Sequence, residues 1–404
     1  MPGNGDSFKG YRWNYFSSLH DGHILRLRAQ HFLDSIDWKA LLSCAAASRS
    51  GIRCKLLPDV GLGYNHMVRI IEFDDSIQWV ARLRMPHLSD DENNSALAKI
   101  IMASEYSTIQ FIQEESKILT PKVHMLELYA NCPVKAPFML MDCLQGNVGM
   151  DLNMKIPPKH KSAVFEQMAE IHIEMFRLRL PKIGNFVGIN EDGSYRQGPI
   201  PGLGGPFDTA ADYFRAWANK TEFGLSKDQL QEAAGSHADE ILESTSSFLT
   251  LIQKAAGSLS LNNYGPFPLC HGDFGHNNMV FDDSYRSLGV IDWEAAFAAP
   301  YEISGEFPLS LSVVPPAIDV PWDYDEAGRP KRPEDIERFA DRDTYIAIVK
   351  QKEEELGLSG ECLLSKILED SNRQYLASAL RLYKRGKPAW YSRLMESFLK
   401  HEDS

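Results

Sequence analysis

The chain has 404 residues, of which 42 are Lys or Arg and 55 are Asp or Glu, which gives a formal net charge of −13. This acidic balance disfavours nucleic acid and anionic membranes as partners, because a phosphate-rich surface binds clustered Lys and Arg. The length suffices for two hydrophobic cores, so we expect two lobes with a cleft between them.

The six cysteines are scattered through the chain and form no C-x-x-C pair. In a chain of this length, such usage is typical of reduced thiols in the cytoplasm. The first residues lack the apolar segment of a signal peptide, and no apolar run approaches the length that spans a bilayer. We therefore expect a cytoplasmic protein without a membrane segment; its oligomeric state is left open.

The N-terminal part of the chain predicts a helix followed by a β-hairpin. Residues 30–48 have helical periodicity, and we assign residues 1–50 to an N-terminal helical extension. Two strands are predicted at 68–73 and 77–85, separated by turn residues. The second strand alternates, and its apolar face is formed by Ile77, Trp79, Ala81, Leu83 and Met85.

The polar face of this second strand carries two arginines. Residues 95–113 predict a helix with Ser95 as its N-cap, and Glu105 falls on the stripe of this helix that should be buried. A buried carboxylate requires a partner. Pairing Arg82 with Glu105 satisfies the carboxylate and holds the guanidinium in a fixed orientation. Arg84, on the same strand face, is the competing partner.

Further along the chain, a strand at 138–141 leaves the first lobe, with Gly146 near the crossing. We expect the first lobe to span residues 51–143 and the second lobe to span residues 144–404. The C-terminal part predicts mainly helices, at 162–179, 208–220, 227–256 and in the charged tail from Pro333.

The segment 268–294 contains the candidate catalytic and metal-binding residues. Its loop 271–278 leads into a strand, a turn and a return strand that ends at Asp292. In an antiparallel hairpin the first strand begins beside the end of the second, so Asn278 should lie beside Asp292, with Asp273 on the loop just before. Oxygen ligands of this kind hold Mg²⁺ against the β- and γ-phosphates of ATP, and a separate carboxylate orients the attacking hydroxyl or accepts its proton. We assign Asn278 and Asp292 to Mg²⁺ and Asp273 to the acceptor hydroxyl.

A glycine-containing turn precedes the first hairpin and supports this interpretation. There a flexible backbone could close over phosphates, although an ordinary turn is the alternative. The nucleotide contacts assigned to this turn are Gly61, Gly63, Tyr64 and Asn65. The pairing with Glu105 aims the Arg82 guanidinium at the α- and β-phosphates of the nucleotide.

The loop 271–278 and the sequence VIDWE at 290–294 resemble those of the aminoglycoside phosphotransferase and choline kinase branch of the protein-kinase-like fold, and especially its fungal members. The resemblance extends from Asp59 to Arg342 and includes the segments 61–65, 79–86, 104–112, 136–146 and 297–316. It implies an α+β, bilobal fold with a small N-terminal β-sheet-plus-helix lobe and a larger, mainly helical C-terminal lobe. The nucleotide-binding lobe is then expected at 51–143 and the catalytic and acceptor-binding lobe at 144–404.

The resemblance also implies roles for individual residues. The adenine of ATP should bond to the hinge backbone around Asp142, Cys143 and Leu144, and His271 should support the catalytic loop. The acceptor pocket should lie in the C-terminal lobe, where carboxylates and aromatic rings suit an amine-bearing small molecule. The candidate acceptor contacts are Glu294, Glu302, Glu306 and Trp322.

Two departures from protein kinases qualify the resemblance. Arg82 stands where protein kinases use lysine, and no activation segment follows 290–294, which disfavours a protein substrate. We predict an ATP-dependent phosphotransferase that transfers the γ-phosphate to a hydroxyl of a small molecule. Two alternatives are an inactive nucleotide- or metabolite-binding protein on the same fold and an enzyme of nucleotidyl transfer. The sequence does not identify the acceptor.

Overall fold

The computed structural model describes residues 22–87, 92–148, 156–190, 192–326 and 329–399. The chain forms two compact units. Unit 1 comprises residues 1–164, 187–195 and 276–295, and unit 2 comprises residues 165–186, 196–275 and 296–404. The lobe boundaries that we placed at residues 50 and 143 stay a prediction.

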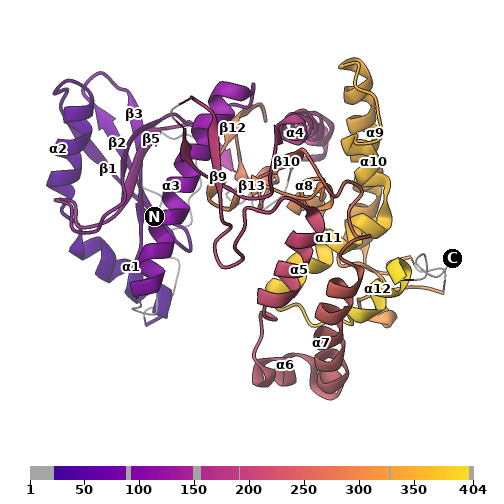
Figure 1. Ribbon diagram of the computed structural model, residues 1–404. Coiled ribbons are helices and arrows are strands. Elements are labelled where there is room, and N and C mark those ends of the chain that lie inside the picture. The colour runs from indigo at the N-terminus through magenta and orange to yellow at the C-terminus, as the bar shows by residue number, and fades with distance from the viewer. Residues whose placement is uncertain (1–21, 88–91, 149–155, 191, 327–328, 400–404) are drawn as a thin grey trace. The chain divides into compact units, whose positions relative to one another are not determined.

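A five-stranded antiparallel sheet forms the centre of unit 1, with the strand order β1-β2-β3-β5-β4 (Figure 1). Its strands are β1 (Cys54–Leu62), β2 (His66–Phe73), β3 (Gln78–Arg84), β4 (Val123–Glu127) and β5 (Phe138–Asp142). The predicted hairpin is confirmed, because β2 pairs with β3 in one continuous register. Trp79, Ala81 and Leu83 are buried as predicted, whereas Ile77 lies before β3 and is 47% exposed.

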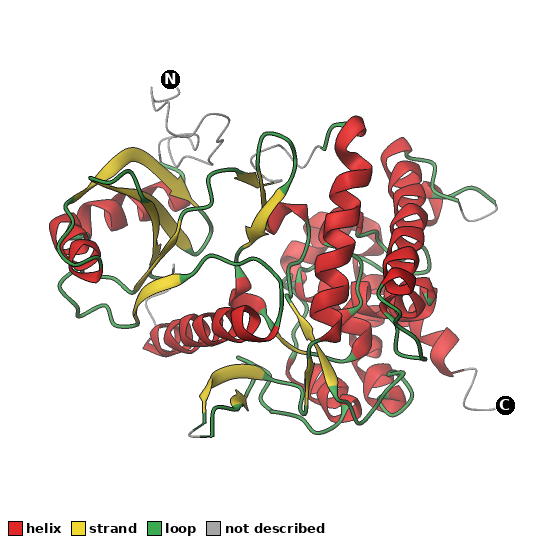
Figure 2. Cartoon of the chain, turned by 90° about the horizontal axis from the view of Figure 1, so that it is seen from above, coloured by secondary structure: helices red, strands yellow, loops and turns green. Residues whose placement is uncertain are grey.

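Helices cover both faces of this sheet (Figure 2). They are α1 (Ile24–Ser35), α2 (Trp38–Ser48) and α3 (Glu92–Glu115). Ala81 of β3 shares a core with Leu41 of α2, while Val80 packs with Met102 of α3. Because side chains alternate along a strand, Arg82 lies on the face that α3 covers.

Two of the helix predictions in unit 1 were wrong in detail. The predicted helix at 30–48 is two helices, because Ile36 is extended and the Asp37 side chain caps the start of α2. The predicted N-cap Ser95 lies inside α3, which begins at Glu92. The helix around Glu105 is otherwise as expected.

A second, three-stranded sheet of unit 1 has the order β12-β11-β6. Its strands are β6 (Asn147–Val148), β11 (Met279–Phe281) and β12 (Ser287–Val290), with the short 3₁₀ helices η4 (His276–Asn278) and η5 (Trp293–Ala295) on either side of the β11–β12 hairpin. Gly146 is required where β6 meets β11, because a Cβ atom there would lie 2.2 Å from the carbonyl oxygen of Phe281.

Unit 2 is mainly helical (Figure 2). Its α-helices are the C-terminal part of α4 (Pro158–Arg177), α5 (Ala210–Lys220), α6 (Lys227–Ala234), α7 (Ala238–Ala255), α8 (Tyr301–Ser304), α9 (Pro333–Glu355), α10 (Leu364–Glu369), α11 (Ser371–Lys384) and α12 (Ser392–Leu399). Its short strands β7 (Arg179–Leu180), β10 (Phe267–Cys270) and β13 (Phe297–Ala298) form one sheet. The strand β8 (Asn185–Ile189) pairs with β9 (Tyr195–Gly198), and residues 187–195 of this pair are assigned to unit 1.

One helix prediction in unit 2 needs correction. The segment 227–256 is divided into α6 and α7 at Gly235, whose φ of +55° ends the first helix. The predicted α+β class is confirmed by a sheet-containing unit and a mainly helical one. Among the residues that the structure describes, none of the helices combines the length and apolar character needed to cross a membrane.

Candidate functional site

The guanidinium of Arg82 is the centre of a buried ion-pair network in unit 1. Its Nη1 atom lies 2.5 Å from both Oε1 and Oε2 of Glu105. The pairing predicted from strand alternation and helix periodicity is therefore present, and Arg84 does not take this place. The side chains of Arg82 and Glu105 are only 12% and 2% exposed, so the contact is shielded from water.

The second amino group of the same guanidinium contacts Asp292. Arg82 Nη2 lies 2.6 Å from Asp292 Oδ1. Asp292 follows β12 with a φ of +66°, a left-handed conformation that Asp adopts more readily than most residues. The backbone N–H of Ile291 donates to the carbonyl of Asn278 at 2.9 Å, so the expected proximity of Asn278 and Asp292 along the hairpin is present.

Glu294 extends this network towards the turn between β1 and β2. Its Oε2 accepts a hydrogen bond of 2.7 Å from Arg84, and its Oε1 accepts one of 3.1 Å from the side chain of Asn65. These bonds connect η5 with β3 and with the turn before β2, and the contact of Glu294 with an acceptor stays a prediction. The Arg84–Glu294 pair was not predicted from the sequence. The only indication of it was the alternation of side chains along β3, which places Arg84 on the same face as Arg82.

The negative charge of Glu105 is unfavourable at its position in this network. Burial raises the pKa of Glu105 to about 7, and the charges of Asp292 and Glu294 act in the same direction. Burial alone would lower the pKa of Arg82, but the surrounding carboxylates outweigh it and raise that pKa, so Arg82 stays protonated. The neighbouring His66 is neutral, because burial and the two arginines hold its pKa well below the ordinary value.

The segment from Gly61 to Asn65 is a tight connection between two strands. Gly61 belongs to β1, Gly63 N–H donates to His66 O at 2.9 Å, and Asn65 O accepts from Met85 N at 2.9 Å. Tyr64 is 64% exposed. These bonds place the turn at the end of the hairpin that carries Arg82; its contact with phosphates stays a prediction.

The predicted hinge follows the end of β5. The carboxylate of Asp142 contacts His124 Nε2 at 2.7 Å and accepts from the backbone N–H of Lys122 at 3.1 Å. Burial, with a smaller effect of Asp142, raises the pKa of the Cys143 thiol to about 12, so it is neutral. Leu144 O accepts from Gly146 N at 3.0 Å. Adenine binding at this segment stays a prediction.

Asp273 lies in unit 2, on the loop after β10. Its Oδ1 atom is 3.0 Å from Nη2 of Arg385, the C-cap residue of α11. His271, which is 1% exposed, accepts from the backbone N–H of Asp273 through Nδ1 at 3.3 Å. Sequence reasoning missed Arg385, because nothing in a charged C-terminal helix singles out one arginine. Asn278 and Asp292 belong to unit 1, so their convergence with Asp273 stays a prediction.

The remaining acceptor candidates have structural partners. Glu302 has no exposed surface, and its carboxylate accepts from Ser260 Oγ at 2.9 Å and from Leu261 N at 2.7 Å. Burial raises the pKa of Glu302. Glu306 is bound by Arg381 at 2.8 Å. These two carboxylates therefore have partners within unit 2, and their contact with an acceptor stays a prediction.

Trp322 differs from these carboxylates, because it is 59% exposed. It lies on the 3₁₀ helix η7 (Pro321–Asp323), with its ring 5.8 Å from the ring of His237. Its exposure leaves an aromatic face open to solvent, and its contact with an acceptor stays a prediction.

The family model described as APH, phosphotransferase enzyme family, matches residues 84–302, slightly more than half of the chain. The chain is 24% identical over 352 residues to the clavilactone A biosynthesis cluster protein Y of Ampulloclitocybe clavipes, covering 84% of this chain and 78% of that protein. It is also similar in structure to a putative aminoglycoside phosphotransferase from Ralstonia eutropha JMP134, with a TM-score of 0.49, 14% identity, and coverage of 90% and 99% of the two chains. A putative fructosamine-3-kinase from Thermobifida fusca YX-ER1 gives a TM-score of 0.42, 12% identity, and coverage of 90% and 99%.

Proposed function

Because the chain belongs to the APH phosphotransferase enzyme family, we propose that it transfers the γ-phosphoryl group of ATP to a hydroxyl group of a small molecule. The family agrees with the predicted protein-kinase-like fold, in which a sheet-containing unit precedes a mainly helical one. The observation that carries the proposal is the Arg82 guanidinium, which is shared between Glu105 and Asp292.

Arg82 is suited to bind the phosphates of the nucleotide. Its guanidinium is planar and permanently charged, and Glu105 holds one of its amino groups in place from a neighbouring helix. A cation that is fixed before the nucleotide arrives loses little conformational freedom on binding it. The glycine-containing turn from Gly61 to Asn65 would cover the phosphates, and the segment from Asp142 to Leu144 would bond the adenine.

Asn278 and Asp292 fit a magnesium ion that is bound together with ATP. They present one amide and one carboxylate from adjoining positions at one end of a hairpin, and the Asp292 side chain is 39% exposed. Mg²⁺ commonly takes one or two protein oxygens and completes its shell with phosphates and water. When bound, it would neutralise the charge of the β- and γ-phosphates.

Asp273 would act on the acceptor. Its carboxylate would orient the attacking hydroxyl and accept its proton, while the bond between the γ-phosphorus and the bridging oxygen of ATP breaks and a new phosphorus–oxygen bond forms. The products are ADP and a phosphate monoester. Arg385 holds one oxygen of this carboxylate and so limits its rotation.

Product analysis tests the proposal. The protein is incubated with MgATP and a panel of polyols and amino alcohols, and the nucleotide and acceptor products are followed by ³¹P NMR. We expect ADP and a phosphorylated acceptor from the wild type and a loss of about 10³-fold or more for Asp273→Asn. Asp283→Asn, an exposed aspartate in the β11–β12 turn, is the matched control.

Each other outcome identifies an alternative. Pyrophosphate with a nucleotidylated acceptor would identify nucleotidyl transfer. Binding of MgATP without any product across the panel would favour an inactive nucleotide-binding protein. An Asp273→Asn variant that is as active as the wild type would refute the role of Asp273.

A further inference from the structure

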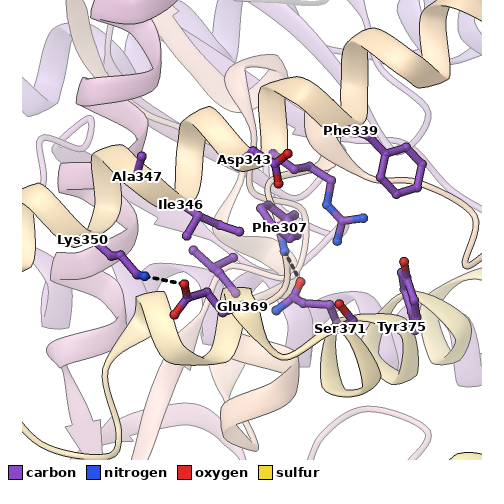
Figure 3. Close-up of a pocket in the computed structure, with 12 residues that line it drawn as sticks. Phe307, Phe339, Asp343, Ile346, Ala347, Lys350, Glu369, Ser371 and Tyr375 are labelled. Carbon is purple, nitrogen blue, oxygen red and sulfur yellow. Dashed lines mark hydrogen bonds and ion pairs between the residues drawn. The ribbon is translucent and has the colours of Figure 1, made fainter. Parts of the chain in front are cut away.

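Unit 2 contains a cavity of about 500 Å³ that is separate from the candidate site. One face of α9 forms one wall, and residues of α10 and α11 form the other (Figure 3). Phe307 lies between these walls, Lys350 and Glu369 lie at one end, and Phe339 and Tyr375 lie at the other (Figure 3). A cavity of this size is large enough for a small organic ligand.

Arg342 is the unusual residue of this cavity. It lines the cavity and is 7% exposed, yet its guanidinium makes no hydrogen bond or ion pair with any residue that the structure describes. It stacks instead on the ring of Phe307, 3.9 Å from the centroid. Burial lowers the pKa of Arg342 to about 10, so the group is still charged at neutral pH. The carboxylates of Glu306 and Asp343 attract this charge without a hydrogen bond to it, so the hydrogen-bonding capacity of the guanidinium is available to an anion bound in the cavity.

Two of the other polar groups that line the cavity, Lys350 and Gln374, have partners of their own, and Tyr375 can act as a donor. Lys350 forms an ion pair with Glu369. Gln374 accepts from the backbone N–H of Phe307 at 3.1 Å and donates to two carbonyls, so it fixes the ring on which Arg342 stacks. Burial raises the pKa of Tyr375, which keeps its hydroxyl protonated and able to donate to an anion.

We propose that this cavity is a second binding site, for a small organic carboxylate with a flat apolar body. The carboxylate would accept hydrogen bonds from Arg342 and Tyr375, and the body would pack between Phe307, Phe339 and Ile346. A single negative charge fits better than two, because Asp343 also lines the cavity.

The site is distinct from the proposed acceptor position at Asp273. Tyr375 lies on the first turns of α11, whereas Arg385, which contacts Asp273, is its C-cap. The two residues are ten positions apart, which corresponds to about 15 Å along the helix axis. Neither Asp273 nor Arg385 lines the cavity, so the inference does not rest on the proposed function.

Calorimetric titration with 2-naphthoate, 2-naphthalenemethanol and 2-naphthyl phosphate tests this proposal. The alcohol has the same apolar body without the charge, and the phosphate carries a second charge. We expect the wild type to bind 2-naphthoate about tenfold or more tightly than the alcohol and more tightly than the phosphate. Arg342→Met should abolish the preference for the carboxylate over the alcohol, and Asp343→Asn should strengthen carboxylate binding, because it removes a like charge.

Control variants separate the site from general effects. Arg338→Met removes a charge one turn away on α9, where Arg338 pairs with Asp335, and should preserve the preference. Asp273→Asn should leave naphthoate binding unchanged. If Arg342→Met does not fold, Arg342→Lys is measured in its place. This variant retains the charge and should retain part of the preference for the carboxylate over the alcohol. Equal binding of the carboxylate and the alcohol, unchanged naphthoate binding in Arg342→Met, or no binding of any probe by the wild type would overturn the proposal.

Discussion

Arg385 Nη2 lies 3.0 Å from Oδ1 of Asp273, although the two residues are 112 positions apart in the chain. The carboxylate that we propose as catalytic is thus paired with a cation from the C-terminal end of α11. Because of this contact, a positive charge lies beside the carboxylate that we propose to act on the acceptor. Glu302 and Glu306 also have partners within unit 2, and of the four side chains predicted to contact the acceptor, only that of Trp322 is largely exposed.

Arg385→Gln should lower kcat by about 5- to 50-fold, because the carboxylate of Asp273 would sample more orientations. The dissociation constant for MgATP should not change, and the stability should change by less than about 1 kcal/mol, because an exposed ion pair contributes little. Steady-state kinetics and nucleotide titration measure these effects. Lys384→Gln, the same loss of charge at the preceding residue, is the control; an equal decrease in both variants would refute a positioning role for Arg385.

Arg82→Lys should weaken MgATP binding by about tenfold, whereas Arg84→Lys should weaken it by less than about threefold. An ammonium group cannot hold Glu105 and Asp292 with the fixed fork of the guanidinium. Arg84 pairs with Glu294 and is the matched control on the same strand face. Calorimetric titration gives both constants. If the Arg84 variant loses more affinity than the Arg82 variant, the phosphate contact belongs to Arg84.

Asp292→Asn should abolish the magnesium dependence of ATP binding while the fold persists. Asn tolerates the left-handed conformation that Asp292 adopts, with a φ of +66°, so this substitution changes the charge with little backbone strain. Thermal unfolding with ATP in the presence of Mg²⁺ or EDTA measures the effect. Asp283→Asn, in the turn of the same hairpin, should retain the wild-type dependence. A magnesium-dependent shift that persists in Asp292→Asn would contradict the metal assignment.

The pH dependence of stability should report on Glu105. Its pKa in the folded protein is raised from 4.5 to about 7. The folded state therefore holds this proton more tightly than the unfolded state. The resulting stability is fully present below pH 4.5 and is lost as the pH rises through about 7.

The comparison of wild type with Glu105→Gln isolates this contribution. Relative to the variant, the wild type should lose about 1–3 kcal/mol of unfolding free energy between about pH 5 and 8. Urea unfolding in the absence of Mg²⁺ measures both profiles. Parallel profiles, or a wild type that gains stability with pH, would show that attraction to Arg82 outweighs the burial of Glu105.

Glu302→Ala should decrease the free energy of unfolding by about 2–4 kcal/mol, because it empties the space of a fully buried side chain and removes the acceptor of the Ser260 and Leu261 donors. The exposed Glu361, which pairs with Lys366, is the control, and its substitution by Ala should change stability by less than about 1 kcal/mol. A stable Glu302→Ala protein with a strongly raised KM for its acceptor would restore Glu302 as a substrate contact.

The sequence by itself determined the contacts that follow from the periodicity of side chains along a strand or a helix. Alternation along β3 placed Arg82 on a polar face, and helical spacing placed Glu105 on the buried stripe of α3, so their pairing could be predicted. The hairpin likewise brought Asn278 beside Asp292. In each case the geometry of one element, or of two strands joined by a short turn, was sufficient.

Only the tertiary structure decided which partner each remaining charged group has. Arg84 and Glu294 are 210 residues apart, and no local period relates them. The pairing of Arg385 with Asp273 and the complete burial of Glu302 depend in the same way on how helices pack within unit 2. A carboxylate has similar local preferences whether it binds a substrate, a metal or an arginine. Its role is therefore set by the neighbours that packing supplies, and these arise from distant parts of the chain.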